Sequence, residues 1–218
     1  MRLGPIAGVT IVVPDLGAAM EFYCARLRLV LIERGQIPAA RALALGVKGW
    51  VGASFASFAI GGAILQLIES AHALARGGSG WTALSLAGSA VRIEPEGCFG
   101  PGGEHWQFAT ARQDSAATTE IHSLTVAVVD SIAAHAFYRG LGLLDASPDV
   151  AIGRLQGGQL LRFEPTPSVP GDAPDGGRLG IHLVSFARSD ASGRRLRGMD
   201  DPTARVLGGA QGEGLELV

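Results

Sequence analysis

An internal repeat constrains the fold of this chain more than any other feature. Residues 9–15 form a run of mostly β-branched residues that ends in an aspartate, and an aromatic pair, Phe22-Tyr23, follows. Residues 124–130 form a similar run ending in an aspartate, and Phe137-Tyr138 follows at the same offsets. Tandem copies of one supersecondary unit indicate a fold in which similar units bury their apolar faces against one another.

Each copy predicts the same local structure. The alternating run predicts a strand with one face on a helix and the other on a cavity. Asp15 and Asp130 are placed to cap the helices that follow, because their carboxylates can accept free backbone N–H groups. The apolar residues at helical spacing predict the buried stripe of each helix: Leu16, Met20 and Tyr23 in the first, and Ile132, Ala136 and Phe137 in the second.

Shorter similarities extend the repeat along the chain. Residues 61–67 parallel residues 157–163, and each segment reads as a turn followed by a strand. Residues 80–87 parallel 180–187, and residues 103–108 parallel 212–217. The chain therefore contains four units. Two longer units, which we call full, each begin with the strand–aspartate–helix pattern, and each is followed by a shorter unit, which we call short. We expect two halves, residues 1–118 and 119–218, joined near residues 115–118, with linkers at 71–80 and 165–177 and a further helix at 38–45.

Composition and charge exclude several classes of protein. The net charge is −2, and the basic cluster at residues 194–197 is short and lies beside Asp200 and Asp201, so a nucleic-acid partner is not expected. Residues 50–68 carry no charge over about the length of a membrane span. However, Gly61-Gly62 interrupts them, so we interpret this segment as a buried β-hairpin rather than a membrane helix.

The two cysteines point to a reducing compartment. Cys24 and Cys98 lie far apart without CxxC spacing, which indicates neither a disulfide framework nor a zinc knuckle. We expect two buried or half-buried thiols in a cytosolic protein.

The repeated pattern of strand, aspartate, helix and Phe-Tyr pair resembles the vicinal-oxygen-chelate superfamily, which contains glyoxalases, bleomycin-resistance proteins and ring-cleaving dioxygenases. The matching residues are Val13-Pro14-Asp15-Leu16 with Phe22-Tyr23, and Val128-Val129-Asp130-Ser131 with Phe137-Tyr138 and Leu141-Gly142-Leu143. The resemblance implies an α+β fold, in which tandem βαβββ modules form two glyoxalase-like halves with curved mixed sheets around a cavity.

The resemblance also implies where a metal would bind. In that family a divalent metal often lies at the cavity floor, held by His or Gln from the start of each module's first strand and by Glu from the middle of its last strand, and it acts as a Lewis acid. The corresponding positions here are Gly8, about Thr82, Gln66 and Gln107 in the first half, and Ser123, Arg162, His182 and Glu216 in the second.

Only His182 and Glu216 are of the expected residue types. A metal centre of this kind needs about three protein ligands. His122 would supply the third only if the strand register slipped by one residue, which would turn its side chain to the other face. A fixed positive charge at Arg162 would also repel a cation.

Two further interpretations of these residues are open. Glu216 could pair with Arg162 and neutralise it, or Arg162 could be free to clamp a carboxylate or enolate of the ligand. In the second case His182 or Glu216 could act as general acid or base. Other ligand contacts are expected from Gln66, Gln107, Ser123, Phe55, Phe58 and Trp81, although glutamines in sheets also satisfy neighbouring backbone and strand aromatics also form plain core.

The expected function is binding of a small, partly apolar organic molecule in a β-walled cavity, with no cofactor preferred. The alternative is a lyase, isomerase or ring-cleaving dioxygenase that uses a single divalent metal (Fe, Mn, Ni or Zn) at His182 and Glu216. A third possibility is a non-catalytic dimerisation module, because such sheets also pair between chains to form a homodimer. Whether the chain is an enzyme stays open at this point.

Overall fold

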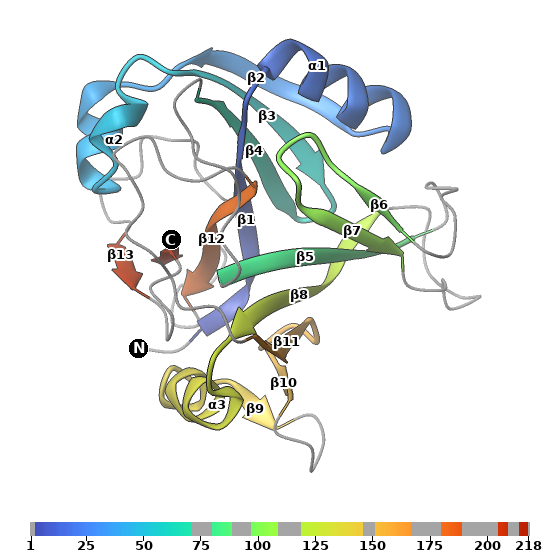
Figure 1. Cartoon of the computed structure of the whole chain (residues 1–218), viewed down its shortest axis with the longest axis vertical. Helices are drawn as coiled ribbons and strands as arrows, with labels where there is room; N and C mark the ends of the chain where they lie inside the picture. The colour runs from blue at the N-terminus through green and yellow to red at the C-terminus, as the bar shows by residue number, and fades with distance from the viewer. Residues whose placement is uncertain are drawn as a thin grey trace.

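A computed structural model describes residues 3–70, 80–88, 97–108, 119–145, 151–166, 180–188, 205–208 and 214–217. The predicted linkers at 71–80 and 165–177 lie almost wholly outside these residues, and so do the join at 115–118 and the basic cluster at 194–197. The described strands form two seven-stranded mixed sheets, with the orders β13-β14-β12-β1-β4-β3-β2 and β6-β7-β5-β8-β11-β10-β9 (Figure 1).

The four predicted units are visible as groups of elements. The first full unit has the order βαβββ with an added helical segment: β1 (Leu3–Val13), α1 (Leu16–Glu21), the π-helical η1 (Phe22–Arg26), β2 (Val30–Gln36), α2 (Ala39–Ala44), the 3-10 helix η2 (Lys48–Trp50), β3 (Ser54–Ile60) and β4 (Ala63–Glu69). The first short unit contains β5 (Gly80–Ala87), β6 (Cys98–Phe99) and β7 (His105–Phe108).

The remaining two units repeat this order. The second full unit contains β8 (Glu120–Val128), α3 (Ser131–Gly140), β9 (Leu144–Asp145), β10 (Ile152–Arg154) and β11 (Leu160–Pro165). The second short unit contains β12 (Gly180–Arg188), β13 (Arg205–Gly208) and β14 (Gly214–Leu217). The α+β class, the βαβββ order and the mixed sheets are confirmed.

Each sheet joins one full unit to one short unit. In the first sheet β1 pairs antiparallel with β12, which brings the first and last units together. In the second sheet β8 pairs antiparallel with β5 of the preceding short unit. Each sheet therefore takes strands from both sides of residue 118, and the boundary between residues 118 and 119 stays a prediction.

The helix starts follow the predicted capping. The Asp15 carboxylate accepts a hydrogen bond from the Ala18 N–H at 2.9 Å. The Asp130 carboxylate accepts hydrogen bonds from the N–H groups of Ile132 and Ala133 at 3.0 and 2.9 Å. These bonds satisfy donors that the first turn of a helix leaves free. Both aspartates are thus confirmed as N-caps.

The buried stripe predicted for α3 is wrong. Ile132 and Phe137 are 68% and 37% exposed, whereas Ala134 and Tyr138 are fully buried. Tyr138 packs between Trp81 and Phe163, with ring centroids 6.4 and 5.5 Å away. The large Tyr138 ring sets which side of the helix faces the core, and the more hydrophobic Ile132 is left in water. In the first copy Leu16 and Met20 do pack against the core, as predicted.

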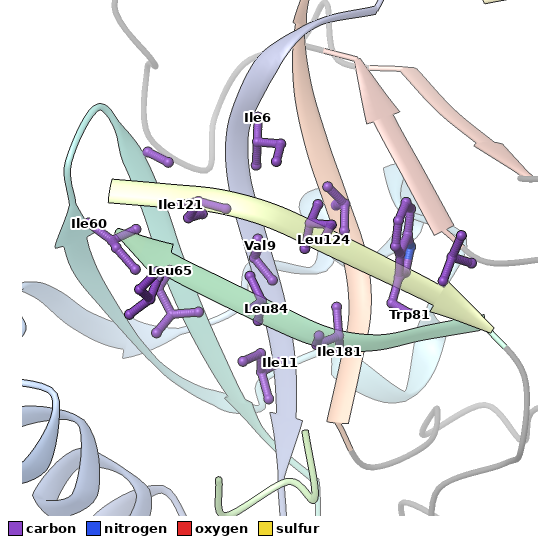
Figure 2. Close-up of a cluster of buried hydrophobic side chains, with 14 of the residues drawn as sticks. Ile6, Val9, Ile11, Ile60, Leu65, Trp81, Leu84, Ile121, Leu124 and Ile181 are labelled. Carbon is purple, nitrogen blue, oxygen red and sulfur yellow. The ribbon is translucent and has the colours of Figure 1, made fainter. Parts of the chain in front are cut away.

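The main core lies between the two sheets. Figure 2 shows β5 and β8 crossing over β1 and β4, with apolar side chains from both sheets meeting between them. The side chains labelled there are Ile6, Val9, Ile11, Ile60, Leu65, Trp81, Leu84, Ile121, Leu124 and Ile181. Burial of this apolar surface is the dominant stabilising contribution to such a fold. One face of each sheet is therefore used for packing against the other sheet.

Two smaller expectations need correction. The hairpin predicted at residues 50–68 exists as β3 and β4 around Gly61, but Trp50 belongs to η2 and not to a strand. Cys24 is exposed rather than buried, while Cys98 is half-buried as expected. No helix in the described part of the chain is long and apolar enough to cross a membrane.

Candidate functional site

The first sheet carries a row of polar side chains on the face opposite the core. Gln66 of β4 lies beside Thr10 of β1, Ser185 of β12 lies opposite Gly8, and Glu216 of β14 lies beside Ser185. The neighbours of these residues along each strand, such as Val9, Leu65, Val184 and Leu215, are in the core. Because successive strand residues point to opposite faces, the polar residues share the other face. We call this the first polar face.

The second sheet repeats the arrangement. Arg162 of β11 lies beside Thr125 of β8, Ser123 lies opposite Ser85 of β5, and Gln107 of β7 lies beside Ser85. Their strand neighbours Leu161, Leu124, Leu84 and Trp106 are in the core. By their pairings, Arg162 corresponds to Gln66 and Gln107 corresponds to Glu216. We call this row the second polar face.

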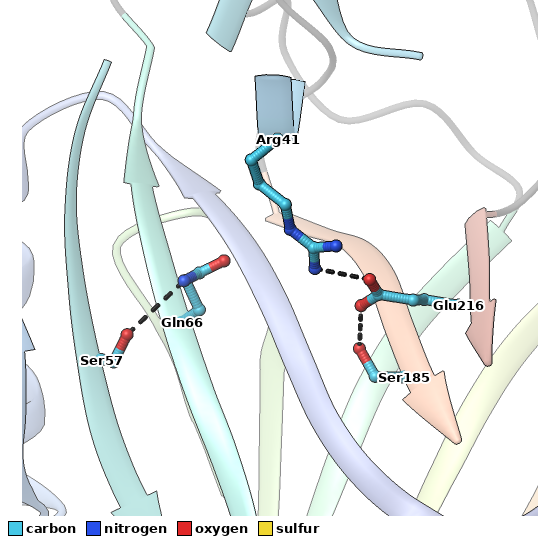
Figure 3. Close-up of polar contacts among 5 residues, drawn as sticks. All are labelled: Arg41, Ser57, Gln66, Ser185 and Glu216. Atoms are coloured by element: carbon cyan, nitrogen blue, oxygen red, sulfur yellow. Dashed lines mark hydrogen bonds and ion pairs between the residues drawn. The ribbon is translucent and has the colours of Figure 1, made fainter. Parts of the chain in front are cut away.

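On the first polar face a buried carboxylate is held by two partners (Figure 3). Glu216 Oε1 lies 2.5 Å from Nη2 of Arg41, which descends from α2, and the Ser185 hydroxyl donates to Glu216 Oε2 at 2.6 Å. The Glu216 side chain is only 3% exposed and that of Arg41 13%. Further along the same face the Gln66 amide donates weakly to the Ser57 hydroxyl at 3.5 Å.

The expectation that Glu216 pairs with Arg162 is wrong. Glu216 is on β14 of the first sheet, and Arg162 is on β11 of the second. The partner is Arg41, which sequence reasoning missed. The helix at residues 38–45 was predicted and is present as α2. However, no spacing or composition signal indicated that this short helix would lie over a sheet and carry an arginine into it.

Helices α2 and η2 cover part of the first polar face. The apolar residues of these helices and of the segments that flank α2 form a second core cluster with the sheet: Ile37, Ala42, Leu45 and Trp50 pack with Val12, Phe55, Ile68 and Leu183. Phe55 is therefore packed under these helices. In the first full unit residues 37–53 connect β2 to β3 and contain these two helices. In the second full unit the corresponding connection, between β9 and β10, is shorter and comprises residues 146–151. The shorter connection lacks the length to form two such helices.

The second polar face differs in its charge. Arg162 is half-buried, and among the described residues it makes no ion pair. The hydroxyl residues Ser85, Ser123 and Thr125 on the same face are buried. Gln107 is half-buried, with its amide nitrogen 3.5 Å from Nδ1 of His105. In the part of the chain that the structure describes, this row therefore combines an arginine that makes no ion pair with neutral hydrogen-bonding groups, which suits an anion.

His105 lies at the margin of the second polar face. It lies half-buried on β7, on the same face as Gln107, and its ring stacks on that of Phe99 with centroids 4.9 Å apart. Its place at the margin of the second polar face was not apparent from the sequence.

The residues at the implied metal position do not fit a divalent metal. On the first polar face Glu216 is the one carboxylate of the row, and the guanidinium of Arg41 already lies against it. A metal there would meet a fixed positive charge. The second polar face offers Arg162, Gln107 and hydroxyl groups, with the His105 imidazole at its margin, and a metal near Arg162 would again meet a fixed positive charge.

The proposed metal ligands are also separated. His122 is on β8 of the second sheet, whereas His182 and Glu216 are on β12 and β14 of the first. His182 is the extra residue of a bulge, between the pairs Thr10–Leu183 and Ile11–Ile181, and its side chain lies outside the described part of the structure. No three His, Cys, Asp or Glu side chains among the described residues are grouped so that they could hold a metal ion.

Two of the aromatic residues expected to contact a ligand are in the core between the sheets. Phe58 packs against Tyr23, and Trp81 packs against Tyr138 and Phe186. Both are buried. Core packing was the alternative that the sequence left open for them.

A buried acid lies outside both polar faces. Glu104 is fully buried, and its Oε1 accepts hydrogen bonds from the Tyr23 hydroxyl and, at 3.0 Å, from the Trp106 indole N–H. Burial raises the pKa of Glu104 against the opposing effect of these bonds, and burial together with the nearby Glu104 charge raises the pKa of Tyr23 well above its ordinary value. The Phe22-Tyr23 pair was expected only to pack, and the Glu104 contact was not predicted.

Solved structures of several proteins share this arrangement. A protein of Bacillus subtilis described as a "putative dioxygenase" superposes with a TM-score of 0.70 at 13% identity, covering 99% of this chain and 85% of its own. Glyoxalase I from Zea mays gives a TM-score of 0.58 at 12% identity, covering 98% of this chain and 91% of its own. The cppA protein of Streptococcus pneumoniae gives 0.53 at 12% identity, with 100% and 99% covered.

No protein-family model and no curated protein sequence matches the chain. At these identities the likeness establishes the three-dimensional arrangement and not the activity. The chain therefore has the fold of the vicinal-oxygen-chelate superfamily, as the repeated strand–aspartate–helix pattern predicted.

Proposed function

We propose that the chain binds a small, partly apolar organic anion, a carboxylate or an enolate, on the second polar face, with Arg162 as the anion-binding residue. The observation that carries this proposal is a half-buried guanidinium without an ion pair among the described residues, on a face lined by Ser85, Ser123 and Thr125.

Electrostatics favours an anion here. A cation that is partly withdrawn from water without a counter-charge is costly, so the site gains from a bound negative group. The planar fork of an arginine matches the two oxygens of a carboxylate or enolate. The serine and threonine hydroxyls and the Gln107 amide can donate further hydrogen bonds to ligand oxygens.

The first polar face is a weaker candidate for the same role. There Glu216 already neutralises Arg41, and α2 and η2 lie over part of the face. The corresponding position of the second polar face holds Gln107 in place of the acid, and the connection in its unit is shorter than the one that forms α2 and η2. The charge thus favours the second polar face.

The proposal is tested by thermal-shift screening with small carboxylic acids, each paired with its neutral amide. We expect some acids to raise the melting temperature of the wild-type chain and their amides to have little effect. Arg162→Ala should abolish the shift, and Arg162→Lys should retain part of it, because the charge stays while the fork is lost. Arg154→Ala is the matched control, since Arg154 is an exposed arginine on the neighbouring strand β10.

The same proteins test the alternatives. A metal-dependent enzyme centred on His182 and Glu216 requires stoichiometric Fe, Mn, Ni or Zn in the purified protein, lost on His182→Ala or Glu216→Ala. A dimerisation module requires a stable homodimer in light scattering and no response to any ligand. Acid-specific stabilisation that survives Arg162→Ala would contradict the assignment of Arg162. A cytosolic location stays a prediction.

A further inference from the structure

We propose that the outward side of helix α3 is a self-association surface, on which a second copy of this chain docks to form an antiparallel helix pair. This surface consists of Ile132, Ala133, Ala136 and Phe137, and we call it the α3 face. The inference is independent of the role proposed for Arg162, because the α3 face lies outside both polar faces.

The α3 face is apolar and exposed. The helix packs on β11 through its other side, where Ala134 and Tyr138 are buried, and it lies at the margin of the molecule (Figure 1). Ile132 is 68% exposed, both alanines of the face are exposed, and the ring of Phe137 is held edge-on against Tyr138 with centroids 5.3 Å apart. Single exposed apolar residues are common, but a helix face made of them is typical of an interaction site.

The corresponding helix of the first full unit lacks this face. By the spacing of the repeat, Gly17 and the exposed Glu21 stand where α3 has Ile132 and Ala136. The apolar face is therefore a property of α3 and not of the repeated unit.

The order of residues in α3 suits a pair related by two-fold symmetry. Ala133 and Ala136 are equally far from the centre of the 134–135 peptide bond, and so are Ile132 and Phe137. In an antiparallel pair with its two-fold axis at that point, Ala133 lies level with Ala136 of the second copy, and Ile132 lies level with Phe137 of the second copy. The small alanines at the centre permit a close approach of the helix axes, and the larger side chains pack on either side of them.

Charge favours the antiparallel arrangement as well. Asp130 caps the start of α3, Arg139 lies in its last turn, and these two residues are equally far from the same point. The antiparallel pair therefore brings opposite charges and opposite ends of the helix dipoles level with each other. The Arg139 charge stays accessible, because its Nε is 3.5 Å from Asp145 and both side chains are more than half exposed. An unrelated partner would not require this symmetry, so the pattern favours a second copy.

Sedimentation equilibrium over a range of protein concentrations tests the proposal. One face of a ten-residue helix is smaller than the roughly 800 Å² per partner of a stable interface, so we expect a weak dimer that forms as the concentration approaches about 1 mM. Ala136→Glu gives α3 the residue of the first unit and keeps a good helix former, but it should weaken the dimer about tenfold or more by burying an unpaired charge. Ala18→Glu, at the exposed alanine of α1 that corresponds to Ala133, is the matched control and should dimerise like the wild type. Both variants should keep the wild-type melting temperature in dilute solution, because both positions are exposed.

Disulfide trapping tests the register, in a Cys24→Ser background because Cys24 is exposed. A mixture of Ala133→Cys and Ala136→Cys chains should cross-link under mild oxidation faster than a mixture of Ala18→Cys and Ala136→Cys chains. A wild type that stays monomeric at about 1 mM, or a dimer that Ala136→Glu leaves unchanged, would overturn the proposal. A dimer lost in Ile32→Lys but kept in Ala136→Glu would place the contact on the exposed strand β2 and would also overturn it.

Discussion

The buried Glu104 predicts a pH-dependent stability that a single isosteric change should remove. Glu104 accepts hydrogen bonds from Tyr23 and Trp106, and its second carboxylate oxygen is buried without a partner among the described residues. Burial raises its pKa, so the folded chain holds the proton more tightly than the unfolded chain. Glu104→Gln keeps the shape of the side chain and removes the titration.

The sign and size of the effect follow from linkage. Because the folded pKa is raised, the stabilisation by the neutral acid is complete below the unfolded value of about 4.3 and is lost as the pH rises through the folded pKa. Within that window the free energy of unfolding should fall by about 1.4 kcal/mol per pH unit. Tyr23 and Cys98 have raised pKa values too, but they titrate at alkaline pH.

Urea unfolding from pH 4 to pH 8 measures this effect without interference from the tyrosine or the thiol. The variant should gain stability relative to the wild type as the pH rises from about 4.3, and the difference should become constant above the folded pKa. Glu33→Gln, at an exposed glutamate of β2, is the control and should leave the pH profile unchanged. A difference between Glu104→Gln and wild type that does not vary over this range would refute the raised pKa of the buried Glu104.

Further perturbations test the packing around this acid and the helix capping. Gly100→Ala should destabilise the chain by about 1–3 kcal/mol through overpacking, because a Cβ there would lie 1.7 Å from Glu104 Oε1. Gly62→Ala is the control, since a Cβ at Gly62 would have no neighbouring atom within 4 Å. It should lower the free energy of unfolding less than Gly100→Ala in the same urea titration. Asp130→Ala should cost about 1 kcal/mol through loss of the N-cap of α3, and an unchanged denaturation midpoint would contradict the capping role.

Features set by short segments could be read from the sequence. The capping roles of Asp15 and Asp130 depend on a carboxylate and the next three residues, so the pattern of residue types was sufficient. The β3–β4 hairpin followed from Gly61-Gly62 between two apolar runs. The alternation of polar and core residues in β4 and β11 likewise placed Gln66 and Arg162 at corresponding positions of two strands.

Features set by tertiary contacts could not be read in this way. No short segment of the sequence indicates that β1 pairs with β12, which lies more than half the chain away. Arg162 was therefore matched with Glu216, although Glu216 belongs to the other sheet. Arg41 enters the first polar face because η2 and Trp50 anchor α2 there, which is a property of packing. The orientation of α3 was missed because hydrophobicity ranks Ile132 above Tyr138, whereas ring packing with Trp81 and Phe163 decides the orientation.

The role of Arg162 is tested most directly by isothermal titration calorimetry with one acid–amide ligand pair on the wild type and on Arg162→Ala. A charge-assisted contact is worth about 1.5–3 kcal/mol, so the wild type should prefer the acid by roughly ten- to a hundredfold. If Arg162 recognises the anion, Arg162→Ala should bind the acid and the amide with nearly equal affinity. An acid preference that persists undiminished in Arg162→Ala would contradict the account, because the anion would then be recognised elsewhere.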